Sequence, residues 1–155
     1  MNKRKFRLEV LLWSIAFPGF GQFLNKKYFK AITFIVLEVM INLGGKVNTI
    51  IMESFLLHTK KAIEEANYLW LMFYPCIYLF AIWDAYKDAG AHELPFMYIP
   101  FVMSAYTGTL GVIYSSKLQL LGFYLGPVFL PLIFMVLGFF IGVYIRKMIY
   151  RYDVK

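Results

Sequence analysis

The distribution of charged residues along the chain predicts long, uncharged helices. No charged residue occurs from Leu69 to Trp83, from Leu94 to Ser116 or from Leu118 to Ile145. With its flanks, each of these stretches approaches or exceeds the roughly 20 residues that a helix needs to cross a hydrocarbon core about 30 Å thick. The pattern therefore predicts a polytopic integral membrane protein.

The same pattern predicts the elements of a single integral membrane domain over residues 1–155. Four spans are expected, at about residues 28–51, 68–86, 95–114 and 119–145. Residues 52–67 carry apolar positions at the i, i+3, i+4 spacing with charges on the opposite face. This predicts an amphipathic linker helix that lies at the membrane interface or caps the bundle. No strand is expected.

The N-terminal segment is too short for an ordinary span. From Leu8 to Phe17 there are ten mostly apolar residues, about 15 Å of helix, before Pro18 and Gly19. If residues 8–24 cross the membrane, the Lys and Arg residues divide eight to eight between its sides; if the segment dips in and returns, they divide twelve to four. The positive-inside rule favours the second arrangement. We therefore predict an all-α bundle of four transmembrane helices plus an N-terminal re-entrant or interfacial helix, with both termini cytoplasmic.

Composition narrows the class further. Hydrophobic residues make up 61% of the 155 residues and the mean hydropathy is +0.63, which leaves no room for a separate soluble catalytic domain. The net charge of +7 comes from basic residues at the ends of apolar segments, where they meet anionic head groups. The bilayer is therefore the expected partner, and nucleic-acid binding is not expected. The single cysteine, Cys76, excludes an intramolecular disulfide and is expected to be a small buried apolar residue.

Two short motifs carry a family resemblance. Residues 18–25 read PGFGQFLN and are followed by an aromatic residue and a lysine, and residues 83–86 read WDAY. The pair resembles a pattern of many small bacterial multi-pass membrane proteins and is similar to the two-transmembrane-helix domain family. The resemblance covers about residues 8–45 and 70–90. It implies a turn after a first apolar helix, an Asp-Ala-Tyr helix ending and a bacterial plasma membrane, and it implies architecture more than activity. The turn residues are Pro18, Gly19 and Gly21.

Glu38 is the sharpest candidate for a functional side chain, because it lies near the middle of a predicted span. A carboxylate there costs about 2.5–3.5 kcal/mol on insertion scales and often marks a proton, ion or substrate path. The structural alternatives are a hydrogen bond from a buried Tyr or Asn, or a neutral protonated carboxyl. Asn42, one turn further on the same face, is a possible partner.

The other polar candidates lie in the two motifs. Asp84 and Asp88 are one helical turn apart and are expected at a solvated helix end. The alternative is a divalent-cation site, which would need further ligands that the sequence does not identify. Gln22 and Asn25 are expected to form hydrogen bonds across the turn and to hold it against Asp84.

Glycine spacing predicts helix packing in the last span. Gly122 and Gly126, and also Gly138 and Gly142, fit the GxxxG pattern that lets helix backbones approach closely. Packing within the chain is the default interpretation, and dimerisation is the alternative.

Nothing in the sequence predicts catalysis. The two histidines, His58 and His92, stand apart without a metal-ligand spacing, and no serine has a nucleophile motif. We expect no cofactor, no metal and no enzymatic activity. The first functional hypothesis is an accessory or scaffold subunit that binds a membrane protein partner or forms a homo-oligomer. The alternative is a channel or transporter component for an ion or small solute, with Glu38 on the path.

Overall fold

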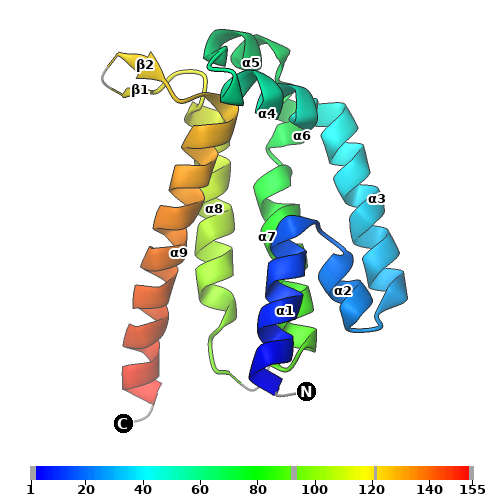
Figure 1. Cartoon of the computed structure of the whole chain (residues 1–155). Helices are drawn as coiled ribbons and strands as arrows, with labels where there is room; N and C mark the ends of the chain where they lie inside the picture. Colours follow the sequence, from blue (N-terminus) through cyan, green and yellow to red (C-terminus); the bar gives the residue numbers. More distant parts are fainter. Residues whose placement is uncertain (1–2, 92–93, 121, 154–155) are drawn as a thin grey trace.

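The computed structural model describes residues 3–91, 94–120 and 122–153, and it is built almost entirely from helices (Figure 1). The N-terminal half contains α1 (Lys3–Ala16), α2 (Phe20–Leu24), α3 (Tyr28–Gly45), α4 (Val47–Phe55), α5 (Thr59–Glu65) and α6 (Tyr68–Leu71). The C-terminal half contains α7 (Tyr74–Asp88), α8 (Tyr98–Tyr114), β1 (Gln119–Leu120), β2 (Phe123–Tyr124) and α9 (Gly126–Asp153). The predicted all-α class is confirmed.

The long helices α3, α7, α8 and α9 run along the length of the molecule, and both termini lie at one end (Figure 1). We call this the terminal end. The short helices α4, α5 and α6 form a cap at the opposite end, beside the β1–β2 hairpin. Helix α1 follows α7 for part of its length, and the chain then turns and returns through α2 to the start of α3. The α1–α2 hairpin therefore opens toward the terminal end.

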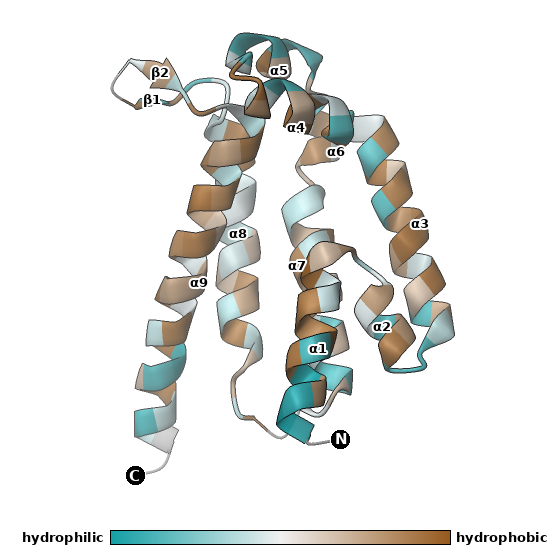
Figure 2. Cartoon of the chain, viewed as in Figure 1, coloured by the Kyte–Doolittle hydropathy of each residue, from teal (hydrophilic) through white to brown (hydrophobic). Residues whose placement is uncertain are grey.

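Three helices are long and apolar enough to cross a membrane: Tyr28–Gly45, Tyr68–Asp88 (α6 and α7 together) and Gly126–Tyr152. Helix α8 has 17 residues, about 25 Å of helix, and it contains no charged residue. Large apolar side chains are exposed along these helices, including Phe29, Leu43, Phe80 and Phe140. Figure 2 shows the same helices as mostly apolar, with polar residues concentrated in the cap and at the terminal end.

The first predicted span is too long, because α3 ends at Gly45 and not near residue 51. Lys46 adopts a left-handed conformation with φ of 55°, and α4 starts directly after it as a separate helix. Gly44, two residues before Lys46, lies against the Trp70 ring, so close that a Cβ there would be 2.5 Å from the indole. The packing of α6 across a pair of glycines therefore marks the end of α3.

The single amphipathic helix predicted over residues 52–67 is also wrong. The segment is broken at Leu57, whose φ is 63°, between α4 and α5. The predicted buried and exposed faces are also partly exchanged, because Glu53 is buried while Phe55 and Leu56 are exposed. Helical periodicity identifies two faces, but it does not say which face the rest of the molecule covers.

The last span starts later than predicted. Residues 119–124 form a hairpin in which Leu120 pairs with Phe123, so the expectation of no strand is wrong here. Gly122 (φ 86°) and Gly126 (φ 71°) adopt conformations that a right-handed helix does not contain. They flank the second strand, so the prediction that this pair packs helices is wrong. Helix α9 instead extends to Asp153.

The second glycine pair packs α9 against α8, its most extensive neighbour. A Cβ at Gly138 would lie 2.6 Å from the carbonyl oxygen of Met103, and one at Gly142 would lie 2.5 Å from the Cα of Pro100. At both positions the α8 backbone therefore approaches the glycine closely, as small residues allow, and the Thr107 side chain also lies against Gly138. Gly138 and Gly142 therefore lie at a close contact between α8 and α9 within the chain.

Candidate functional site

The polar residues of the two motifs meet where α2 and the start of α3 cross the last turns of α7. We call this cluster the α2–α7 junction; it comprises Gln22, Asn25, Lys30, Asp84 and Asp88. The buried Gln22 donates from Nε2 to the carbonyl oxygen of Ala81 at 2.8 Å and to Asp84 Oδ2 at 3.2 Å. The predicted contact between Gln22 and Asp84 is therefore present.

Asn25 lies in the junction but has a different partner from the one expected. Its Nδ2 donates to the carbonyl oxygen of Ala85 at 2.7 Å, so it contacts the backbone of α7 and not Asp84. Lys30 supplies the charge that sequence reasoning missed: its Nζ lies 2.7 Å from Asp84 Oδ1 and 2.8 Å from Asp88 Oδ2. The lysine that follows the PGFGQFLN motif was the signal that could have identified it.

The turn residues allow the hairpin to enter this narrow space. Pro18 and Gly19 lie between α1 and α2 as predicted, and both are buried. Gly19 has a φ of 102°, and a Cβ there would lie 2.8 Å from the carbonyl oxygen of Ala31. A Cβ at Gly21 would fall on the Ser14 hydroxyl and would also meet α7. Both positions therefore require glycine for close approach.

Glu38 lies inside the bundle with 5% of its surface exposed. The Tyr74 hydroxyl donates to its Oε1 at 3.2 Å, and no hydrogen-bond partner for its Oε2 is found among the described residues. Tyr74 stacks on Tyr78 with ring centroids 5.6 Å apart, and the Tyr78 hydroxyl donates to the carbonyl oxygen of Ile15 at 2.6 Å. This arrangement links α3, α7 and α1 by polar groups.

Asn42 does not take part in this arrangement. Its Nδ2 donates to Oδ1 of Asn48 at 3.1 Å, across the break between α3 and α4. The prediction that Asn42 is the partner of Glu38 is therefore wrong. Tyr74 is the partner instead. A hydrogen bond from a buried tyrosine was one of the two structural alternatives that the sequence left open for Glu38.

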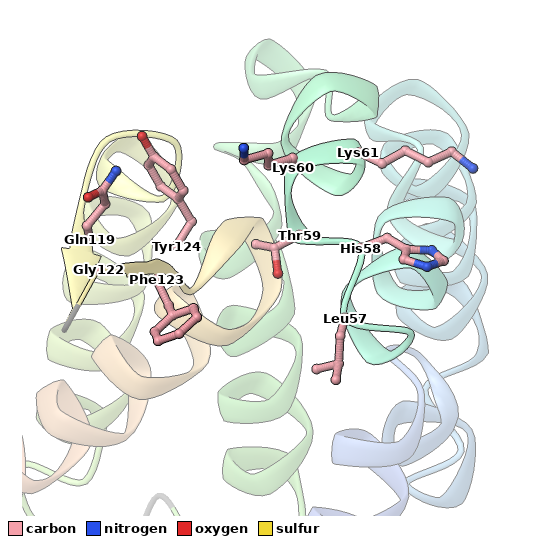
Figure 3. Close-up of a pocket in the computed structure, with 9 residues that line it drawn as sticks. All are labelled: Leu57, His58, Thr59, Lys60, Lys61, Gln119, Gly122, Phe123 and Tyr124. Atoms are coloured by element: carbon pink, nitrogen blue, oxygen red, sulfur yellow. The ribbon is translucent and has the colours of Figure 1, made fainter.

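A second carboxylate is buried in the cap. Glu53 lies 2.7 Å from Lys61 Nζ and 2.9 Å from His58 Nδ1, and these two contacts hold its pKa below the usual range, Lys61 contributing most. They close the turn between α4 and α5. Figure 3 shows Lys61 and His58 extending away from the β1–β2 hairpin, and a hollow of about 820 Å³ is lined by residues of both the cap and the hairpin.

We predict that the cap loosens in acid because of Glu53. A carboxyl group whose pKa is lowered by folding stabilises the folded state above its unfolded pKa and loses that contribution as the pH falls through the folded value. The protection of the α4 and α5 amides, measured against the intrinsic exchange rate at each pH, should therefore fall once the wild type is acidified below the usual pKa range of a glutamate. In Glu53→Gln this protection should already be lower at neutral pH and should change little with acid. The exposed Glu64→Gln should behave as the wild type; equal acid responses in Glu53→Gln and the wild type would refute the assignment.

Two apolar grooves flank the contact between Leu79 of α7 and Phe101 of α8, which line both of them. The first, the α7–α8 groove, has a volume of about 550 Å³ and is lined by residues that include Cys76, Trp83 and Ala105. Cys76 is exposed, so the prediction that it is buried is wrong. The second, the α1–α9 groove, has a volume of about 430 Å³ and receives side chains from α1, α7, α8 and α9.

Among the described residues, no group of three or more His, Cys, Asp or Glu side chains is placed to hold a metal ion. His92 lies outside the described residues. Comparison of the chain with protein-family models, curated proteins and solved structures found no match.

Proposed function

We propose that this chain is a non-enzymatic, multi-pass protein of the plasma membrane that acts as an accessory or scaffold subunit by binding a membrane partner. In this proposal α3, α6 with α7, α8 and α9 are the four spans. The α1–α2 hairpin is re-entrant, and both termini are cytoplasmic.

The charge distribution supports this topology. Eleven described Lys and Arg residues belong to segments at the terminal end, and four belong to the cap and its neighbouring loop. The first set is Lys3, Arg4, Lys5, Arg7, Lys26, Lys27, Lys30, Lys87, Arg146, Lys147 and Arg151, and the second is Lys46, Lys60, Lys61 and Lys117. Such a bias favours a cytoplasmic terminal end. The buried Pro18–Gly19 turn packs against α3, which supplies the protein cover that a re-entrant backbone needs in lipid.

The α7–α8 groove is the observation that carries the partner-binding proposal. Its lining includes three small side chains, Cys76, Ala105 and Thr109, and the Cys76 Sγ lies 3.5 Å from the Thr109 Oγ1. Aromatic side chains, including Trp83 and Tyr106, complete the lining. Transmembrane helices associate where small residues let their backbones approach, because van der Waals contact rather than hydrophobicity drives the association. The groove therefore suits an apolar partner helix.

Cys76 provides the experiment, since it is the single cysteine and it lines the groove. A short photo-crosslinker attached to Cys76 in intact membranes should capture one stoichiometric partner. Ala105→Phe, which fills the groove, should abolish the capture without changing the protein level. The matched control is Cys76→Ser combined with Val39→Cys, which moves the crosslinker to an exposed position on α3 and should capture no stoichiometric partner. Equal capture from both positions would refute the proposal.

The second candidate function is a channel or transporter component, and Glu38 favours it. A buried carboxylate inside a proposed span, with one oxygen for which the described residues supply no hydrogen-bond partner, is the kind of group that marks a proton or ion path. Glu38→Gln distinguishes the candidates. If the Glu38→Gln variant is present at the normal level and still supports the protein's function in vivo, a proton-coupled path through Glu38 is excluded. If that function is lost while partner capture from Cys76 stays normal, the path is favoured.

A further inference from the structure

The α1–α9 groove leads toward a basic region at the terminal end. Its lining includes Leu11 and Ile15 of α1 and Val136 and Phe140 of α9. One turn before Leu11, at the i−4 position, α1 carries Arg7. Both walls are therefore apolar toward the middle of the bundle, and α1 becomes basic as it approaches the terminal end (Figure 2).

Helix α9 likewise changes from apolar to basic toward the terminal end. Val136, Phe140, Val143 and Lys147 follow one another at spacings of three or four residues, so they form one stripe along the helix. Val143 and Lys147 line a second hollow of about 420 Å³ together with Arg146. The apolar groove is thus followed, one helical turn further along α9, by a hollow that contains two cationic side chains.

One arginine from each wall binds the connection between α7 and α8, at two different residues of that connection. Arg7 donates from Nη1 to the carbonyl oxygen of Gly90 at 3.3 Å, and Arg146 donates from Nε to the carbonyl oxygen of Pro95 at 3.0 Å. Each bond uses one of the five N–H donors of a guanidinium group. The two bonds hold the guanidinium groups of Arg7 and Arg146 at the terminal end. The remaining N–H donors of each group have the planar, forked arrangement that binds phosphate oxygens.

We propose that the α1–α9 groove is a binding site for an anionic phospholipid, with an acyl chain in the groove and the phosphate held by Arg7, Arg146 and Lys147. The groove is apolar and opens at the side of the proposed spans, where acyl chains are the surrounding solvent. The cationic end lies at the side predicted to be cytoplasmic, where the leaflet is anionic and each nearby Lys or Arg strengthens binding. A partner helix would also fill the groove, but only an anionic ligand would in addition supply a negative charge for Arg7, Arg146 and Lys147.

The test is lipid retention by the full chain. Purified in mild detergent and mixed with equal amounts of phosphatidylglycerol and phosphatidylcholine, the wild type should retain one phosphatidylglycerol in native mass spectrometry. Arg7→Gln combined with Lys147→Gln should weaken that binding about tenfold or more. Val136→Trp, which fills the groove and leaves the cations in place, should weaken it as well. Inorganic phosphate added alone should not compete, because it lacks the acyl chain.

The matched control removes two other charges from the terminal end. Lys26 and Lys27 are exposed in the connection between α2 and α3, away from the groove lining, so Lys26→Gln combined with Lys27→Gln should retain the lipid as the wild type does. Equal loss in both double variants would show general electrostatic attraction and would overturn the site. Equal retention of the two lipids, or a co-purified polypeptide protecting Val136, would overturn it too. If the double variants unfold, the folded Val136→Trp still decides the outcome.

Discussion

Asp84→Ala should lower the free energy of unfolding by about 2–3 kcal/mol. The carboxylate accepts from the Gln22 amide and pairs with Lys30. Its removal leaves one donor of the fully buried Gln22 without its partner, and a buried unsatisfied group carries the full desolvation penalty. The hairpin should detach from α7, and the melting temperature in detergent and the protein level in native membranes should both fall.

Asp88→Ala is the matched control. Asp88 is one turn away on the same helix and lies 2.8 Å from Lys30 Nζ, but it makes no contact with the Gln22 amide. Lys30 is partly exposed, so losing this half of the ion pair should cost about 1 kcal/mol or less. Equal melting of the two variants would mean that the junction contributes through the ion pair alone, against the role assigned to the Gln22 hydrogen bond.

Gly142→Leu should separate α8 from α9. A Cβ at this position would lie 2.5 Å from the Cα of Pro100, and backbone does not move aside as a flexible side chain does. Forcing extra carbons into a packed interface costs about 1–3 kcal/mol, and an atom placed against backbone belongs at the upper end of that range. The separation should also stretch the hydrogen bond from the Ser104 hydroxyl to the carbonyl oxygen of Met135, which is 2.8 Å long.

Thermal melting in detergent checks this prediction, with Ile141→Leu as the control. Ile141 is the adjacent residue of α9 and is exposed, so it receives the same side chain without meeting α8. The control should melt as the wild type does. If Gly142→Leu did so too, the close approach of the two helices would be refuted.

The sequence predicts features that depend on local chemistry. Proline followed by glycine interrupts a helix wherever it occurs, so the turn at Pro18 and Gly19 follows from the pattern. The contact between Gln22 and Asp84 follows from two motifs that occur together. The helical class follows from the length of the uncharged stretches.

Features that depend on packing between distant parts of the chain cannot be predicted from the hydrophobic and polar pattern. The end of α3 depends on the Trp70 ring lying against Gly44, whereas the Gly44–Gly45 pair alone permits a helix end without requiring one. Glu53 is buried because Lys61 and His58 fold back over it, whereas periodicity alone placed it on the polar face. Likewise, glycine at the GxxxG spacing permits both helix packing and the positive φ of Gly122, and the sequence does not distinguish them.

The central claim is that the N-terminal hairpin enters the membrane and returns to the same side. In a Cys76→Ser background, single cysteines replace Lys5, Lys27 or Lys60, which are exposed at the start of α1, at the start of α3 and in the cap. Each is labelled with a membrane-impermeant maleimide added to sealed cells and to inverted vesicles. We predict that the cysteines at positions 5 and 27 are labelled from the cytoplasmic side and the one at 60 from the other side. Labelling of positions 5 and 27 from opposite sides would contradict the account.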